Sequence, residues 1–434
     1  MIYLLLSVSF ISFCFLLYNQ EKGFRSFFEP GTVLLAFFTL VYVGPSTVAS
    51  IINLDIGSIN TQTISLIINY SLIFIFTFTL SYILFSKYYF YSFSTTRIVK
   101  SSKEDFKSIK RIWHPKYLLI FIAFIFIFDF FVINLFGFSF GKLGSIYITR
   151  GDIPTIINQF LKLAANLVSI AVGYFFYLYF SYPQQYQRFR WLMLLATLII
   201  MQSILYSARS GIILLVLAYF GARFLSGKQI GLHKELIFGL IFIVFMQFIA
   251  ILRGGGSFTA SVMDLYPSEF ISIYLNATFI SNELLAGTLQ DTPYSSYIRA
   301  FTAFVPSQIN PDKWGLELWY LTTYHPHMIA EGNGTAFGII PEAMINFGKY
   351  SMALQAIFLG WFLNCLTYYA KKHMYSFSAF MPLLFIFNYQ ILYTGVIRTE
   401  SLSFVAGFVI SFLLPYIIFS FIIRLRIQKN KVAI

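Results

Sequence analysis

Apolar residues fall in long continuous runs along this chain of 434 residues. The runs are about 16 to 25 residues long, which is the length that a helix needs to cross a bilayer. They lack the alternation of apolar and polar residues that is typical of a membrane β-barrel. The pattern predicts an all-α, polytopic integral membrane protein with about eleven transmembrane helices, at 2–19, 31–53, 62–86, 117–137, 156–181, 191–207, 211–225, 236–252, 340–369, 376–396 and 401–423.

One long stretch, from Arg253 to Phe337, departs from this pattern. It carries seven acidic residues but three basic ones, together with two histidines that are separated by a single residue. Apolar residues at helical spacing inside it indicate that it is partly helical. The sequence therefore predicts three parts: transmembrane helices 1–8 in residues 1–252, a large external loop in 253–339, and helices 9–11 with a basic cytoplasmic tail in 340–434.

The cations are distributed unevenly between the two faces that these spans define. The hydrophobic fraction is 58%, the mean hydropathy is +0.74 and the net charge is +13, and one set of alternate connectors holds 21 of the 30 lysines and arginines. Cytoplasmic loops carry such an excess. The N-terminus and the large loop are therefore expected outside and the C-terminus in the cytoplasm. Because the basic loops face anionic lipid, the charge does not indicate a nucleic-acid partner.

Five arginines lie outside or within the predicted spans, on the face that is otherwise poor in cations. A charged side chain at membrane depth costs about 2.5–3.5 kcal/mol on insertion scales, so it tends to be paired or functional. The alternative for each is snorkelling to the interface or a salt bridge. Because one guanidinium group can bind two phosphate oxygens at once, a lipid diphosphate is the anion that we expect these arginines to bind. The five are Arg150, Arg209, Arg253, Arg299 and Arg398.

His325 and His327 flank Pro326, which predicts an extended chain at this point. Two histidines so placed are candidates for a general base, for substrate hydrogen bonding or for metal binding. Glu331 is the one close further ligand, so no metal site is predicted. Cys14 and Cys365 lie in apolar runs and support neither a disulfide nor a thiolate metal site.

Carboxylates offer an alternative base, and aromatic side chains offer surfaces for a sugar. Glu269, Asp264 and Glu342 are the candidate acids, each of which also has an ordinary structural interpretation. Aromatic residues of the loop are candidates for stacking on sugar faces or for an interfacial aromatic belt. These are Trp314, Trp319, Tyr320 and Tyr324.

Three segments together resemble the Wzy-type O-antigen and capsule polymerases and the related O-antigen ligases. They are SARSGIILL, then ILRGGG at the start of the large loop, then HPHMIAEGNGTAFGIIPEAMINFG. The helix-rich plan and the late outer loop are similar along most of the chain. The resemblance places Arg209 and Arg253 at positions that hold a diphosphate. His327 lies eleven residues before Gly338, a spacing like that of the ligase loop histidine, but Met328 follows it where ligases have asparagine.

The resemblance implies an inverting glycosyl transfer without metal or other cofactor, on the outer face of the bacterial cytoplasmic membrane. The donor would be a growing glycan on undecaprenyl diphosphate, and the acceptor a sugar hydroxyl of a new lipid-linked repeat unit. A chain-length regulator and a flippase would be further partners. Two alternatives stay open: an O-antigen ligase, and, from another class, a flippase or transporter of lipid-linked oligosaccharide. A transporter is expected to carry charges in several helices and an internal repeat, which this sequence lacks.

Overall fold

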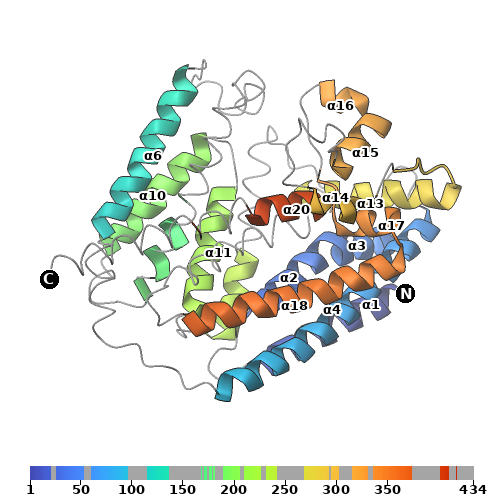
Figure 1. Cartoon of the computed structure of the whole chain (residues 1–434), viewed down its shortest axis with the longest axis horizontal. Helices are drawn as coiled ribbons and strands as arrows, with labels where there is room; N and C mark the ends of the chain where they lie inside the picture. The colour runs from blue at the N-terminus through green and yellow to red at the C-terminus, as the bar shows by residue number, and fades with distance from the viewer. Residues whose placement is uncertain are drawn as a thin grey trace. The chain divides into compact units, whose positions relative to one another are not determined.

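In the computed structural model, every regular element among the described residues is a helix (Figure 1). The chain forms two compact units, which are described separately: unit 1 is Met1–Ser94, Gly231–Thr367 and Ile391–Ile410, and unit 2 is the remainder. The described residues are 1–20, 26–52, 60–95, 115–135, 168, 171–173, 175–177, 179–180, 189–205, 210–225, 231–241, 268–292, 295–302, 315–330, 336–373, 401–409 and 417.

Four helices among the described residues are long and apolar enough to cross a membrane, and all four lie mainly in unit 1. The qualifying segments are Ile2–Asn19, Pro30–Ser50, Thr61–Tyr88 and Lys349–Tyr369. They belong to α1 (Ile2–Asn19), to the consecutive helices α2 (Pro30–Phe38), η1 (Thr39–Val43) and α3 (Gly44–Ile52), to α4 (Thr61–Thr95) and to α18 (Lys349–His373). The helical, membrane-spanning character predicted from the apolar runs is thus confirmed in its coarse form. The predicted runs 156–181, 236–252, 376–396 and 401–423 lie largely or wholly outside the described residues.

The second of these segments contains a wide turn directly before a Gly-Pro pair. Residues Thr39–Val43 form a π-helical turn directly before Gly44-Pro45. Proline has no N–H to donate to the preceding turn and its ring crowds that turn, so an α-helix cannot run regularly through this position. A π turn accommodates one additional residue, and the helix continues without breaking.

The predicted span 340–369 is wrong as a single helix, because the chain turns at 346–348. A short helix, α17 (Ile339–Ile345), ends there and α18 begins at Lys349. Gly348 has a φ of +58°, a conformation that glycine adopts without steric cost. The Asn346 side chain donates a 2.7 Å hydrogen bond to the Glu342 carbonyl, which satisfies one of the last acceptors of α17.

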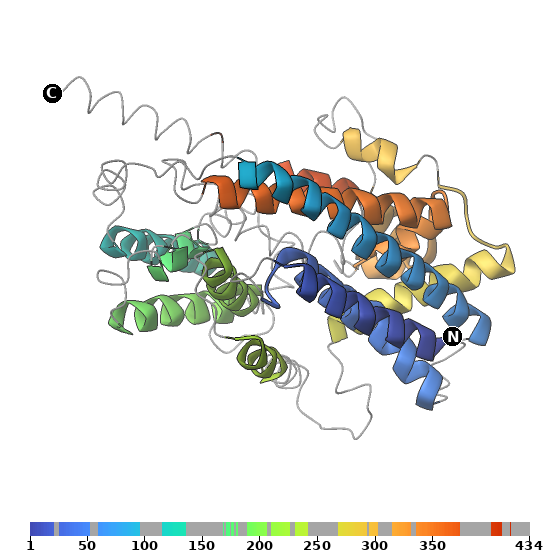
Figure 2. The ribbon, with the colours of Figure 1, turned by 90° about the horizontal axis from the view of Figure 1, so that it is seen from below.

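The large polar stretch supplies four more helices of unit 1, which confirms its partly helical character. They are α13 (Ser268–Ala286), α14 (Ser296–Phe301), α15 (Leu316–Tyr324) and α16 (Pro326–Ala330). Both views show these helices and α17 at the end of unit 1 where α1, α4 and α18 begin and α3 ends (Figures 1 and 2). The described helices of the stretch therefore form a helical cap on one end of the candidate spans.

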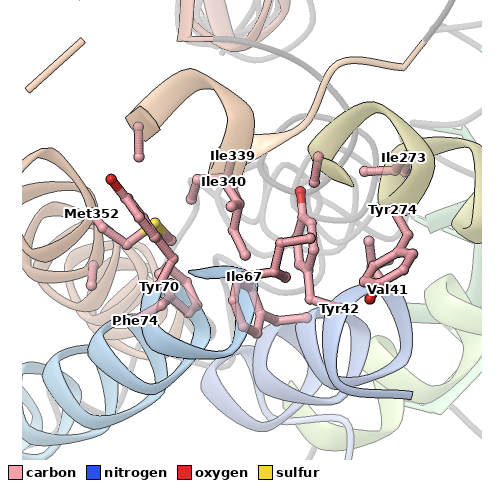
Figure 3. Packing of buried hydrophobic residues seen from close by; sticks show 14 of the residues in the cluster. Val41, Tyr42, Ile67, Tyr70, Phe74, Ile273, Tyr274, Ile339, Ile340 and Met352 are labelled. Atoms are coloured by element: carbon pink, nitrogen blue, oxygen red, sulfur yellow. The ribbon is translucent and has the colours of Figure 1, made fainter. Parts of the chain in front are cut away.

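The cap is joined to the long helices by a buried apolar core. Ile339 and Ile340 of α17 and Ile273 of α13 pack with Tyr42 of η1 and Ile67 of α4 (Figure 3). Hydrogen bonds also connect these elements. Ser46 of α3 donates a 3.2 Å hydrogen bond to the Tyr274 hydroxyl of α13, and Asn276 Nδ2 of α13 donates one of 2.8 Å to the Ala336 carbonyl, just before α17. Burial raises the pKa of Tyr274 to about 12, so its hydroxyl stays neutral.

α4 and α18 approach each other closely at a glycine. A Cβ on Gly360 would lie 3.0 Å from the backbone nitrogen of Tyr82. Asn364 Nδ2 donates a 3.0 Å hydrogen bond to the Tyr82 carbonyl, and Ser81 Oγ donates one of 3.3 Å to the Ala356 carbonyl. Small residues that admit close backbone contact, with polar side chains bonded across the interface, are typical of membrane helix pairs.

Unit 2 contains α6 (Pro115–Leu135), α10 (Phe189–Leu205) and α11 (Ser210–Leu225), and α10 packs against both of the others. Arg223, in the last turn of α11, places its guanidinium 5.1 Å from the centre of the Phe180 ring. It also donates a 3.3 Å hydrogen bond to the Tyr219 hydroxyl. A cation held against aromatic rings is stabilised at the edge of an apolar helix.

Candidate functional site

The buried carboxylate of Glu342 joins four helices at the capped end of unit 1. Glu342 lies on α17 and accepts a 2.6 Å hydrogen bond from Ser296 Oγ of α14. Its oxygens also accept the backbone N–H of Ser401 at 3.0 and 3.2 Å and the Ser401 hydroxyl at 3.0 Å, at the start of α20 (Ser401–Phe408). Gln355 Nε2 of α18 donates a further, longer bond of 3.3 Å. One acidic side chain thus fixes α14, α17, α18 and α20 against each other.

Two effects act on the protonation of Glu342, and burial is the larger. Removal from water raises the pKa of the Glu342 carboxyl above its usual range, whereas the bonds from Ser296 and Ser401 act to lower it. Burial disfavours the charged form, and donated hydrogen bonds favour it. Glu342 therefore takes up a proton at a higher pH than an exposed glutamate does.

A ring of polar side chains surrounds this carboxylate. Asn346 accepts hydrogen bonds from Ser295 Oγ at 2.8 Å and Ser296 N at 3.0 Å, and its own amide donates to Ser296 Oγ at 2.9 Å. Tyr297 is hydrogen-bonded to Ser351 and accepts a 2.5 Å bond from Gln355 Nε2. Because burial and the nearby Glu342 raise the pKa of Tyr297, its phenol is neutral in this network.

Arg299 is the one predicted arginine whose side chain the structure describes. It lies on α14, one turn after Ser296, and only 8% of its surface is exposed. Such deep burial favours a role in holding α14 in the cap, since a buried guanidinium must be well paired. The other four arginines, Arg150, Arg209, Arg253 and Arg398, lie outside the described residues, as do Asp264, Trp314 and the Glu269 side chain.

The two histidines lie at the junction of α15 and α16, and they differ in exposure. His325 is half-buried, with Nε2 3.0 Å from the Tyr320 hydroxyl and its ring 5.4 Å from that of Phe279. Burial, together with the nearby His327, lowers the pKa of His325, so the imidazole is neutral at pH 7. His327 is exposed, and the two rings are 6.0 Å apart.

The prediction of an extended chain at these histidines is wrong in part. His325 is non-helical, with φ −136° and ψ 53°, as expected for a residue before proline. Pro326, however, begins α16, so His327 lies on a helix. Proline is well tolerated at the first helical position, where its missing N–H has no partner within the helix.

Of the aromatic residues proposed for sugar stacking, Trp319 and Tyr320 are buried. The Tyr320 ring packs 5.5 Å from Phe337 and 5.6 Å from Phe279, measured between ring centres. The Tyr324 hydroxyl accepts a 2.9 Å hydrogen bond from the backbone of Gln290. These side chains hold α15 against α13, and their rings pack largely against other residues of the cap.

Two further buried acids lie near the opposite ends of the long helices of unit 1. Glu29 caps α2 by accepting the N–H groups of Gly31 at 3.1 Å and Thr32 at 3.3 Å, and it is bonded to the Tyr82 hydroxyl. Glu235 accepts the Ser26 hydroxyl at 2.9 Å and the Phe27 N–H at 2.8 Å. The two carboxylates fix the segment before α2 in place.

Sequence reasoning did not identify Ser296, Gln355 and Ser401 as partners of Glu342. A signal was present: Glu342 stands in the apolar segment GIIPEAMI, and a buried carboxylate requires donors. Nothing in the sequence says which serine or amide supplies them, because the partners lie between 13 and 59 positions away.

Among the described residues no group of three or more histidines, cysteines, aspartates and glutamates is arranged to hold a metal ion. No protein-family model, no curated protein and no solved structure matches the chain.

Proposed function

We propose that the chain is a membrane glycosyltransferase that polymerises lipid-linked oligosaccharide repeat units, for O-antigen or capsular polysaccharide. The observation that supports it most is the helical cap at the end of unit 1, with His325 and His327 on it (Figure 1). A lipid diphosphate lies at the membrane surface and its glycan extends into water. A site for that substrate is therefore expected where apolar helices end beneath a polar, folded cap.

In this proposal the capped end faces the exterior of the bacterial cytoplasmic membrane. The charge distribution supports it, because the connectors predicted to be cytoplasmic carry 21 of the 30 cations. Within unit 1, α1, α4 and α18 begin at the capped end, and α3 ends there. This arrangement agrees with an external N-terminus and an external large loop.

The reaction requires a nucleophile, a leaving group and a base. The hydroxyl oxygen of the acceptor sugar attacks the anomeric carbon of the donor glycan, and the bond from that carbon to the diphosphate oxygen breaks. The hydroxyl proton passes to a base, and undecaprenyl diphosphate leaves with its electron pair. Arginines stabilise the charge that develops on the leaving group. A positioned base contributes about 10²–10⁴-fold to the rate.

We assign the base to His327, with His325 and Glu269 as the other candidates. Exposure favours His327, because an acceptor sugar can reach it, whereas His325 Nε2 is engaged with Tyr320. Arg209 and Arg253 are proposed as the principal diphosphate ligands, with Arg150 and Arg398 as further candidate ligands. The burial of Arg299 makes it a weaker candidate for direct contact with the ligand.

Deletion of the gene in its host tests the proposal, with surface polysaccharide examined on a gel. A polymerase deletion is expected to leave lipid A–core capped by a single repeat unit. Loss of all repeat units would instead point to a ligase or a flippase. A ladder of unchanged length would contradict any role in polymerisation.

Purified protein provides a direct second test. Lipid-linked repeat units added to the protein in nanodiscs are expected to yield a ladder of longer products and free undecaprenyl diphosphate. A ligase would need lipid A–core as acceptor and would form no ladder from repeat units alone. A flippase would move the lipid-linked unit across a bilayer without forming any glycosidic bond.

A further inference from the structure

An exposed apolar patch lies where α14 meets the turn between α17 and α18. Ile298 of α14 is 63% exposed, Phe347 of the turn 59% and Tyr350 of α18 82%. The pieces that carry them are bonded together: Ser295 and Ser296 to Asn346, and Tyr297 to Ser351. The Tyr297 and Phe347 rings are stacked at 6.4 Å. The segments that carry the patch are therefore held together as one continuous surface.

The patch continues into the outward face of α18. Tyr350, Leu354, Ile357, Phe358 and Trp361 all lie on that face and are exposed, whereas Met352, Ala356, Leu359 and Leu363 on the other face are buried. The exposed residues recur at i, i+4, i+7, i+8 and i+11, which is one stripe of a helix. Because Lys349–Tyr369 is a candidate span, this stripe is the surface that lipid would contact.

α14 presents opposite chemistry on its two sides. Ser296, Arg299 and Ala300 are buried in the cap, with Ser296 bonded to Glu342, whereas Ile298 is exposed. Exposure of large apolar side chains to water is unfavourable. Aromatic residues beside a lysine, here Phe347, Lys349 and Tyr350, are typical of the membrane–water interface.

We infer that α14 and the 346–348 turn rest in the interfacial layer of the membrane, with Ile298 and Phe347 inserted among lipid headgroups and upper acyl chains. The occupant of the patch is thus the bilayer, and α14 is a short interfacial helix on the underside of the cap. The inference does not depend on the reaction that the protein catalyses. It places the Glu342 network at the membrane–water boundary, because Ser351 and Gln355 of that network lie in the first two turns of the candidate span.

Site-directed spin labelling of the full-length protein in nanodiscs tests this placement. In a background with Cys14→Ser and Cys365→Ser, labels are attached at Ile298→Cys and Phe347→Cys, and collisions with oxygen and with a water-soluble nickel chelate are measured. Leu354→Cys reports the lipid-facing span, and Thr323→Cys, exposed on α15, reports the water phase.

The ratio of oxygen to nickel collisions at 298 and 347 is expected to lie between those of the two reference sites. A ratio equal to that at 323 would overturn the inference, because the patch would then lie in water. Protection from both reagents, with dipolar broadening that increases with the amount of labelled protein per disc, would also overturn it and indicate a second copy on the patch.

Discussion

Ser296 Oγ donates a 2.6 Å hydrogen bond to Glu342 Oε1 while it accepts one of 2.9 Å from the Asn346 amide. The hydroxyl proton is therefore directed at the carboxylate. This relationship fixes α14, a helix of the polar cap, to α17, which leads into a candidate span.

Ser296→Ala removes one donor from a buried carboxylate. A loss of about 1–3 kcal/mol in the free energy of unfolding is expected, because Glu342 loses part of its compensation for leaving water. Thermal unfolding of the purified protein measures it. Thr322→Ala is the matched control, since the Thr322 hydroxyl bonds to the carbonyls of Leu318 and Trp319 on its own helix. Equal effects of the two changes would show that the Ser296–Glu342 bond contributes little.

Glu342→Gln is expected to change how stability depends on pH. The folded-state pKa of Glu342 is raised above the ordinary value of 4.5, so the folded protein holds the proton more tightly. The stability from that proton is fully present below pH 4.5 and is lost as pH rises through the folded-state pKa. Glutamine does not titrate, so unfolding temperatures of Glu342→Gln should decline less over this range. Glu283→Gln, which makes the same change at a partly exposed acid on α13, is the matched control.

Gly360→Leu is expected to separate α4 from α18. The Cβ of the added side chain would lie 3.0 Å from the Tyr82 nitrogen. Because this nitrogen belongs to the backbone of α4, it cannot move aside easily. Overpacking of this kind typically costs about 1–3 kcal/mol and sometimes more. Trp361→Leu introduces the same side chain at the next position, on the exposed face, and should leave unfolding nearly unchanged. The same unfolding temperature for both variants would contradict a close helix crossing at Gly360.

His327→Ala is expected to lower polymerisation about 10²–10⁴-fold, because the acceptor hydroxyl would lose its base. His325→Ala should lose much less activity, since its Nε2 is already engaged with Tyr320. Initial rates on lipid-linked repeat units measure both. Wild-type rates in both variants would shift the base to Glu269 or another acid.

Arg209→Ala and Arg253→Ala are each expected to abolish polymer while the protein still inserts in the membrane. Each removes a guanidinium from the developing charge of the diphosphate. Glycan gels and membrane fractionation of the variants provide the readout. Arg223→Ala is the control for removal of an arginine, because the Arg223 guanidinium packs on Phe180 and Tyr219. Normal chain length in both Arg209→Ala and Arg253→Ala would remove them from the site.

The apolar runs predicted the long helices well, because a continuous run of suitable length has one stable form in a bilayer. The bounds 2–19 and α1 agree residue by residue. The run 340–369 misled, because hydropathy does not register a turn that is made by one glycine and one asparagine side chain, Gly348 and Asn346.

The candidate site was less predictable, and the difference lies in distance along the chain. Glu342 could be noticed as an acid in an apolar segment, but its donors come from α14, α18 and α20 and depend on tertiary packing. In the same way, Trp319 and Tyr320 are aromatic residues of a kind that stacks on sugars in binding sites. Only the packing of Tyr320 against Phe279 and Phe337, and the burial of Trp319 in the same apolar cluster, reveal that both belong to the core.

The π turn at Thr39–Val43 sets the phase between the two halves of its segment. An α-helix advances by about 100° per residue, so one residue more or fewer rotates everything beyond it by that angle. Deleting a single residue here would rotate α3 by that angle relative to α2 and would turn Ser46 away from Tyr274, its partner on α13. The extra residue thus acts as a rotational spacer: α2 can keep its contact with α1 while α3 faces the cap.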